Sequence, residues 1–235
     1  MGRVENKRLV TVIQLLVDKC KPLSVECCKR LIDQFDEAVV REFFDENEEG
    51  NNDTHAFAEW YALKLAKSAS TAPKLLNELV LRINNPKLWL EVAENPNCGV
   101  ETLELLVMLR SDSCQQIRWA AAKSTKADNA LLKKLVACGG VETCKLVMNH
   151  PNVKIETLWF MVDTLPVRDL REFAINPNTP ELMLHIMAWK QGGVLAEEVA
   201  NNSSTPERTL RRLLHSKNPI VRSAAKRNLE ERKLY

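Results

Sequence analysis

The chain has 235 residues and a formal net charge of +2, from 33 basic and 31 acidic side chains. This balance gives no general reason to expect binding to nucleic acid or to a membrane surface. No apolar run approaches the roughly 20 residues of a membrane-spanning helix, and seven glycines, two tyrosines and few alternating β-branched runs disfavour a strand-based fold. The composition therefore predicts a soluble protein made mostly of helices.

Residues 1–56 are predicted to form a helical cap or a degenerate first repeat. Apolar residues recur at helical spacing from Leu9 to Val17, and a second helix is expected behind them. Residues 36–53 hold eight acids against one arginine, a net charge of −7. Their last part, residues 45–53, is predicted to be an exposed acidic loop.

From residue 57 to 235 the sequence repeats. In six places a small or apolar anchor residue is followed by a leucine after ten residues and by a leucine or methionine after thirteen. A period of about 26 residues suits one supersecondary unit per repeat, stacked on its neighbours along one axis. The anchors, including a last one near the C-terminus, are Ala66, Ala93, Ala122, Met148, Ala174, Ala200 and Ala225.

The repeat around Ala174 indicates how one unit folds. Leu170, Phe173 and Ala174 form an apolar stripe on a short helix, which the Asn-Pro-Asn of residues 176–178 ends. The Thr-Pro-Glu of residues 179–181 is predicted to begin a second helix, with threonine as the N-cap and proline in the first turn. A small anchor residue would let neighbouring helices approach closely.

Residues 176–181, followed by Leu184, and the Val221-Arg222 run with its two alanines resemble the leucine-rich repeat variant family of bacteria. The resemblance covers residues 57–235 and implies a right-handed solenoid in which α-helices alternate with short 3₁₀ or second helices. A period nearer 26 than the ~24 residues of such families also permits two ordinary α-helices per repeat, as in HEAT arrays. We therefore predict an all-α, right-handed superhelix of about seven short two-helix repeats.

The seven cysteines are an odd number scattered through predicted helices, which favours reduced thiols and a cytoplasmic location. The resembled family includes a member with an iron–sulfur cluster, so an iron–sulfur repeat protein is one alternative. Cys20, Cys27 and Cys28 form the closest grouping. They lack the Cys-x2-Cys spacing that places several thiolates around one cluster. We predict that they pack in a core, and that the protein holds no metal and no cofactor.

No sequence pattern indicates catalysis, since the chain lacks a glycine-rich phosphate loop, Gly-x-Ser-x-Gly and His-Glu-x-x-His. We predict a non-enzymatic protein. The HEAT-like DNA glycosylases for alkylated bases share the expected architecture, so a nucleic-acid-binding or glycosylase-like solenoid is the second hypothesis. Against it, the five tryptophans stand at different offsets from the anchors. The basic residues on which it would rest are Arg208, Arg211, Arg212, Arg222 and Arg227.

The favoured function is binding of another protein. Eleven and twelve residues after the anchor most repeats carry at least one polar side chain, whereas the repeats of Met148 and Ala174 carry mainly aromatic and aliphatic ones. If the geometry repeats, these side chains form an exposed apolar patch of the kind that marks protein interfaces; otherwise a longer helix or the loop near Leu165 covers them. The predicted contact residues are Trp159, Phe160, Leu182, Met183, Ile186 and Trp189.

Overall fold

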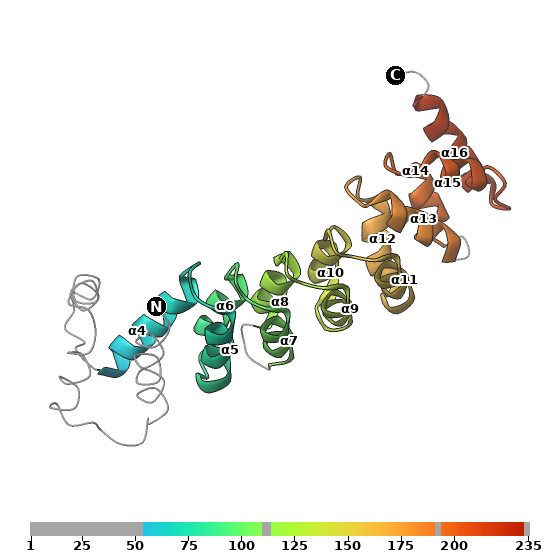
Figure 1. Ribbon diagram of the computed structural model, residues 1–235. Helices are drawn as coiled ribbons and strands as arrows, with labels where there is room; N and C mark the ends of the chain where they lie inside the picture. The colour runs from blue at the N-terminus through green and yellow to red at the C-terminus, as the bar shows by residue number, and fades with distance from the viewer. Residues whose placement is uncertain (1–53, 110–113, 191–193, 233–235) are drawn as a thin grey trace. The chain divides into compact units, whose positions relative to one another are not determined.

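The computed structural model describes residues 54–109, 114–190 and 194–232 (Figure 1). In these ranges it contains thirteen helices and no strand, which confirms the all-α class for the described part of the chain. The predicted cap and its acidic loop lie almost entirely outside these ranges. Cys20, Cys27 and Cys28 lie outside them as well.

The helices belong to two units, Met1–Ala120 and Ala121–Tyr235, and α8 (Cys114–Lys123) contains the boundary. None of the described helices is long and apolar enough to cross a membrane. Unit one contains α4 (Thr54–Lys67), α5 (Pro73–Arg82), α6 (Pro86–Glu94) and α7 (Val100–Met108). Unit two contains α9 (Asn129–Cys138), α10 (Gly140–Met148), α11 (Ile155–Thr164), α12 (Val167–Ile175), α13 (Glu181–Lys190), α14 (Ala196–Asn201), α15 (Glu207–Leu213) and α16 (Pro219–Glu231).

Within each unit the helices pack in two layers. First helices, which contain or precede an anchor, pack on first helices: α4 on α6 in unit one, and α12 on α14 and α14 on α16 in unit two. Second helices, which follow an anchor, do the same: α5 on α7 in unit one, and α9 on α11, α11 on α13 and α13 on α15 in unit two (Figure 1). Every described second helix is an α-helix. The 3₁₀ form that the resemblance allowed is therefore not the one present there.

The core is built from the positions that the repeat frame selects. Each of the seven anchors is at most 3% exposed, and so is each leucine ten residues behind the first six. Phe173, beside the anchor Ala174, is fully buried. Because an alanine anchor leaves little space between first helices, its replacement by a larger side chain would overpack the layer.

Asparagine side chains join several of the repeats to the repeat before them. Asn202 is 5% exposed, and its Nδ2 donates to the carbonyl oxygens of Ala174 at 2.7 Å and Asn176 at 2.9 Å. Its Oδ1 accepts the backbone N–H of Ser204 at 2.8 Å. In unit one Asn95 makes the same three bonds with residues at the matching positions. Buried turn carbonyls are thus satisfied by the following repeat.

His150 takes the place of the asparagine in its turn. Its Nδ1 accepts the backbone N–H of Asn152 at 3.1 Å. Because a neutral imidazole carries its proton on the other nitrogen, Nε2 donates to the carbonyl oxygen of Ser124 at 3.0 Å. His150 is therefore a structural residue of its turn.

In the last repeat the bonding asparagine lies one residue further from its anchor than in the repeat before it. Asn228 donates to the carbonyl oxygens of Ala200 and Asn202, at 2.8 and 2.9 Å, as Asn202 does one repeat earlier. Asn202 lies two residues after its anchor, whereas Asn228 lies three residues after Ala225. Ala225 is 0% exposed and keeps the buried anchor position, whereas Lys226 is exposed, so the extra residue lies between the anchor and Asn228.

The threonines before the second helices bond to the C-terminal end of the preceding first helix and do not cap the second helix that follows. The Thr179 hydroxyl donates to the carbonyl of Phe173 at 2.6 Å, and the Thr205 hydroxyl donates to the carbonyl of Val199 at 2.5 Å. Pro206 is the N-cap of α15, and its carbonyl accepts the first helical hydrogen bonds. The prediction of a threonine N-cap with proline in the first turn was wrong, because free carbonyls at a helix end compete for the hydroxyl.

Candidate protein-interaction surface

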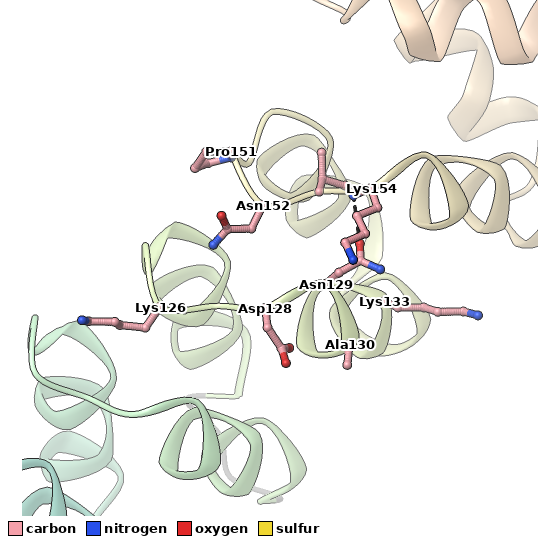
Figure 2. A pocket seen from close by; sticks show the side chains of 9 residues that line it. Lys126, Asp128, Asn129, Ala130, Lys133, Pro151, Asn152 and Lys154 are labelled. Carbon is pink, nitrogen blue, oxygen red and sulfur yellow. Dashed lines mark hydrogen bonds between the residues drawn. The ribbon is translucent and has the colours of Figure 1, made fainter.

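A hollow of about 820 Å³ lies between the starts of the second helices α9 and α11 (Figure 2). Lys126, Lys133 and Lys154 line it together with Asp128. In Figure 2 the side chains of Lys126 and Lys133 extend in opposite directions, with Asp128 between them. The ammonium groups therefore do not converge on one ligand position.

The hollow follows from the stacking of second helices. The Asn129 side-chain oxygen inside it accepts hydrogen bonds from the Lys154 amide and the Thr157 hydroxyl, both at 2.9 Å. A smaller hollow of about 340 Å³ occupies the matching place between α5 and α7, where the Thr102 hydroxyl donates to the Asn77 side-chain oxygen at 3.1 Å. Both hollows occupy the same place between stacked second helices, and the Asn77 and Asn129 side chains in them are already bonded to the next second helix. Neither hollow is therefore the favoured site.

The six predicted contact residues do not lie together on the surface. Met183 and Ile186 are 0% and 1% exposed, so their prediction as surface contacts was wrong. Helix α13 packs against α11, α14 and α15, and a helix with three neighbours buries most of its perimeter. Trp159, Phe160 and Leu182 are half-buried. Trp189, the sixth, is 54% exposed.

The aromatic ring of Phe160 is partly covered by a cation from the neighbouring second helix. The Lys133 ammonium on α9 lies 4.8 Å from the centre of the Phe160 ring on α11. Such a cation–π contact at an exposed site contributes about 0.5–1 kcal/mol. This part of the predicted patch therefore presents a charge beside an aromatic ring rather than a continuous apolar area.

Trp189 is exposed and also fixed in place. The Arg212 guanidinium of α15 lies 3.4 Å from the centre of its ring. The indole N–H donates to Nε2 of His185 at 3.2 Å, and the two rings meet edge to face. Leu182, His185 and Trp189 follow one another at helical spacings of three and four residues, so they share one face of α13. A large aromatic side chain held outward in this way is typical of a preorganised interface contact.

The contacts of His185 define its protonation state. The indole N–H of Trp189 can only donate, so Nε2 of His185 is unprotonated, and Nδ1 carries the proton and donates to the Thr209 hydroxyl at 2.7 Å. Partial burial, followed by the charges of Arg208 and Arg212, lowers the pKa of His185. The imidazole is therefore neutral at pH 7.

We expect His185 to reduce stability as the pH falls. Because its pKa is lower in the folded state, the unfolded chain takes up its proton more readily, and the contribution present above the unfolded pKa of about 6.5 is lost below it. Between pH 7.5 and 5.0, the melting temperature of wild type should therefore fall by more than that of His185→Gln. Thermal melts followed by circular dichroism measure this, with exposed His215→Gln as the control. Equal losses in wild type and His185→Gln would contradict the prediction.

The five C-terminal arginines differ in what they contact. Arg211 forms an ion pair on its own helix at 2.7 Å, Arg222 donates to two backbone carbonyls, and Arg227 donates to a side-chain amide oxygen. Neither Arg208 nor Arg212 forms an ion pair with any residue that the structure describes. These two guanidinium groups lie one turn apart on α15 without a carboxylate partner in the described part of the chain, and that of Arg212 also stacks on the Trp189 ring.

Two buried thiols, those of Cys98 and Cys144, are poorly suited to chemistry. Cys98 and Cys144 are buried and free. Burial raises the pKa of the Cys98 thiol to about 12, and burial with the charges of Asp169 and Cys138 raises the pKa of Cys144 to about 11. Both thiols therefore stay protonated at neutral pH, where the thiolate is the nucleophile and the metal ligand. Within the described ranges, no group of three or more His, Cys, Asp or Glu could hold a metal ion.

These features describe an all-α protein whose best candidate site is a surface between two second helices. We call this the α13–α15 surface: Leu182, His185 and Trp189 on α13, with Arg208 and Arg212 on α15. Comparisons with protein-family models, with curated proteins and with solved structures found no match to the chain.

Proposed function

We propose that the chain is a non-enzymatic, cytoplasmic scaffold that binds another protein through the α13–α15 surface. In this proposal, residues 57–235 form a right-handed α-solenoid of about seven two-helix repeats, related to the leucine-rich repeat variant proteins of bacteria or to HEAT-type arrays. The observation that carries the proposal is Trp189, which is 54% exposed and yet held by Arg212 and His185.

The solenoid is supported by hydrogen bonds at a repeating sequence separation. The Asn95 and Asn202 side chains, with His150 and Asn228, each bond to carbonyls 26–29 residues earlier in the chain. Within each unit, first helices pack on first helices and second helices pack on second helices, and these contacts are also one repeat apart. Nearest-neighbour contacts of this kind are the basis of stability in repeat arrays.

A binding role is favoured because the exposed ring of Trp189 and the neighbouring charges of Arg208 and Arg212 are both unfavourable for the stability of the free protein. A tryptophan that served only for packing would be stabilised by burial, at about 25 cal/mol for each Å² of apolar area removed from water. Trp189 instead keeps more than half of its surface in solvent. Arg208 and Arg212 stand four residues apart on one helix face, where like charges repel each other. A partner that covers the Trp189 ring and neutralises the two arginines would gain the free energy of burying the ring and would remove the repulsion between the charges.

A peptide-display selection against the full-length protein tests the proposal. A random peptide library should yield enriched sequences on wild type, and these should bind Trp189→Ser at least ten-fold more weakly, because buried tryptophans dominate interface energies. Met108→Ser is the matched control. Met108 is 70% exposed and lies fifteen residues after Ala93, as Trp189 lies fifteen residues after Ala174.

The selected peptides should bind Met108→Ser as they bind wild type, and both variants should melt within about 2 °C of wild type, since substitutions at exposed sites change stability little. Peptides that bind Trp189→Ser with undiminished affinity would place the interface elsewhere. Failure of wild type to enrich any sequence, combined with binding of single-stranded nucleic acid, would support the second hypothesis instead.

A further inference from the structure

We propose that the α13–α15 surface recognises an acidic peptide segment in extended conformation, with two carboxylates two residues apart seated on Arg208 and Arg212 and an apolar side chain against Trp189. This inference rests on the proposed function and specifies the chemistry of the partner. Guanidinium groups bind carboxylates through paired N–H donors, and such charge-assisted bonds are stronger than neutral ones.

The spacing of the two arginines selects the spacing of the carboxylates. Positions four residues apart on an α-helix are separated by about 6 Å along its axis. Side chains two residues apart in an extended chain lie on the same side and are separated by about 6.6 Å. A Glu-x-Glu or Asp-x-Asp segment running along α15 therefore places one carboxylate at each guanidinium.

The position of Trp189 accounts for the third contact. Second helices that pack on one another have axes about 8–10 Å apart, and α13 packs on α15. An extended chain spans this distance in about two to three residues. The indole ring, next to Arg212 and two helical turns from Leu182, offers an apolar area for one aliphatic or aromatic side chain of the segment.

The electrostatic environment favours a short acidic segment over a nucleic-acid backbone. Partial burial, followed by the positive charges of Arg208 and Arg212, lowers the pKa of His185, and neither arginine forms an ion pair with any residue that the structure describes. The positive charge is local, because Arg211 is paired with Glu207 and Glu181 is exposed at the start of α13. A phosphate track needs positive charge along its length.

Fluorescence anisotropy of the full-length protein tests the inference with three labelled probes. The first is a nine-residue peptide with Glu-Ala-Glu followed by Ala-Leu, the second has glutamine in place of both glutamates, and the third is a twelve-nucleotide oligouridine. We expect wild type to bind the glutamate peptide at least ten-fold more tightly than the glutamine peptide, with an affinity that falls as salt is raised.

Substitutions on α15 distinguish an effect of the positions of Arg208 and Arg212 from an effect of the net charge of the helix. Arg208→Gln and the double variant Arg208→Gln/Arg212→Gln should each weaken binding of the glutamate peptide, the double variant by at least ten-fold. Arg211→Gln removes the same charge from the same helix, but Arg211 is already paired with Glu207. It should change the affinity by less than about two-fold. Unchanged melting temperatures would show that the variants are folded.

Equal binding of the two peptides, or equal losses in Arg208→Gln and Arg211→Gln, would overturn the acidic-segment inference. If neutral peptides from the display selection still needed Trp189 for binding in that case, the proposed protein-binding function would stand and only the acidic-segment inference would fail. Tighter binding of oligouridine than of either peptide, with loss in the double variant, would overturn both and assign the surface to nucleic acid.

Discussion

The Asn202→Asp variant should lose about 3–5 kcal/mol of unfolding free energy, the usual cost of an uncompensated buried charge. The new carboxylate can still accept the N–H of Ser204, but it places a negatively charged oxygen against the carbonyl oxygens of Ala174 and Asn176, to which Nδ2 now donates. Chemical denaturation of the full-length chain at pH 7 measures the loss. The adjoining repeats should be affected with it, because each repeat is stabilised by its neighbours.

The pH dependence and a matched control make this prediction specific. Burial would raise the pKa of the introduced carboxyl, so the deficit should shrink as the pH falls and the protonated group regains one donor. Asn178→Asp, in the preceding turn, introduces the same charge at an exposed position. It should cost less than about 0.5 kcal/mol. Similar losses in the two variants would mean that the asparagine bonds do not hold the repeats together.

The Ala174→Leu variant should be destabilised by about 1–3 kcal/mol through overpacking. Ala174 is 0% exposed, beside the fully buried Phe173, and its carbonyl accepts the Asn202 bond, so the backbone has little freedom to move away from a larger side chain. For a chain of this size, the melting temperature should fall by about 2–4 °C per kcal/mol.

Ala137→Leu serves as the control for this change, because Ala137 is exposed on α9 and the added carbons would extend into solvent. Its melting temperature should stay within about 2 °C of wild type. A wild-type melting temperature in Ala174→Leu would show that the first helices are not closely packed at the anchor.

The helices and the repeat frame could be predicted because they depend on local patterns. Apolar residues at helical spacing determine which face is buried, and prolines with asparagines mark the turns. The frame identified buried positions at Ala174 and Leu184. The sequence did not indicate that Asn202 would donate to two carbonyls of the preceding repeat.

The candidate site was less predictable because it depends on contacts between helices. Met183 and Ile186 looked like surface residues by comparison with polar positions in other repeats, but α13 has neighbours on three sides. Arg212 stacks on Trp189 from a different helix and stands at a different distance from its own anchor, so the repeat frame does not pair the two residues. One available signal was missed: Thr102, Thr157 and Thr209 all stand nine residues after an anchor, and each contacts a polar side chain of an earlier second helix.

The most direct test of the binding surface is a titration of the ¹⁵N-labelled full-length protein, in which the indole N–H signals of the five tryptophans are followed by NMR. The ligand is a peptide from the display selection, and Trp189→Phe assigns its own signal. The Trp189 signal should shift on binding, because its indole group lies in the α13–α15 surface. The Trp89 signal should not, because that side chain is buried and bonded to the carbonyl of Ile83. A titration in which bound peptide leaves the Trp189 signal unmoved would contradict the proposal that this surface is the binding site.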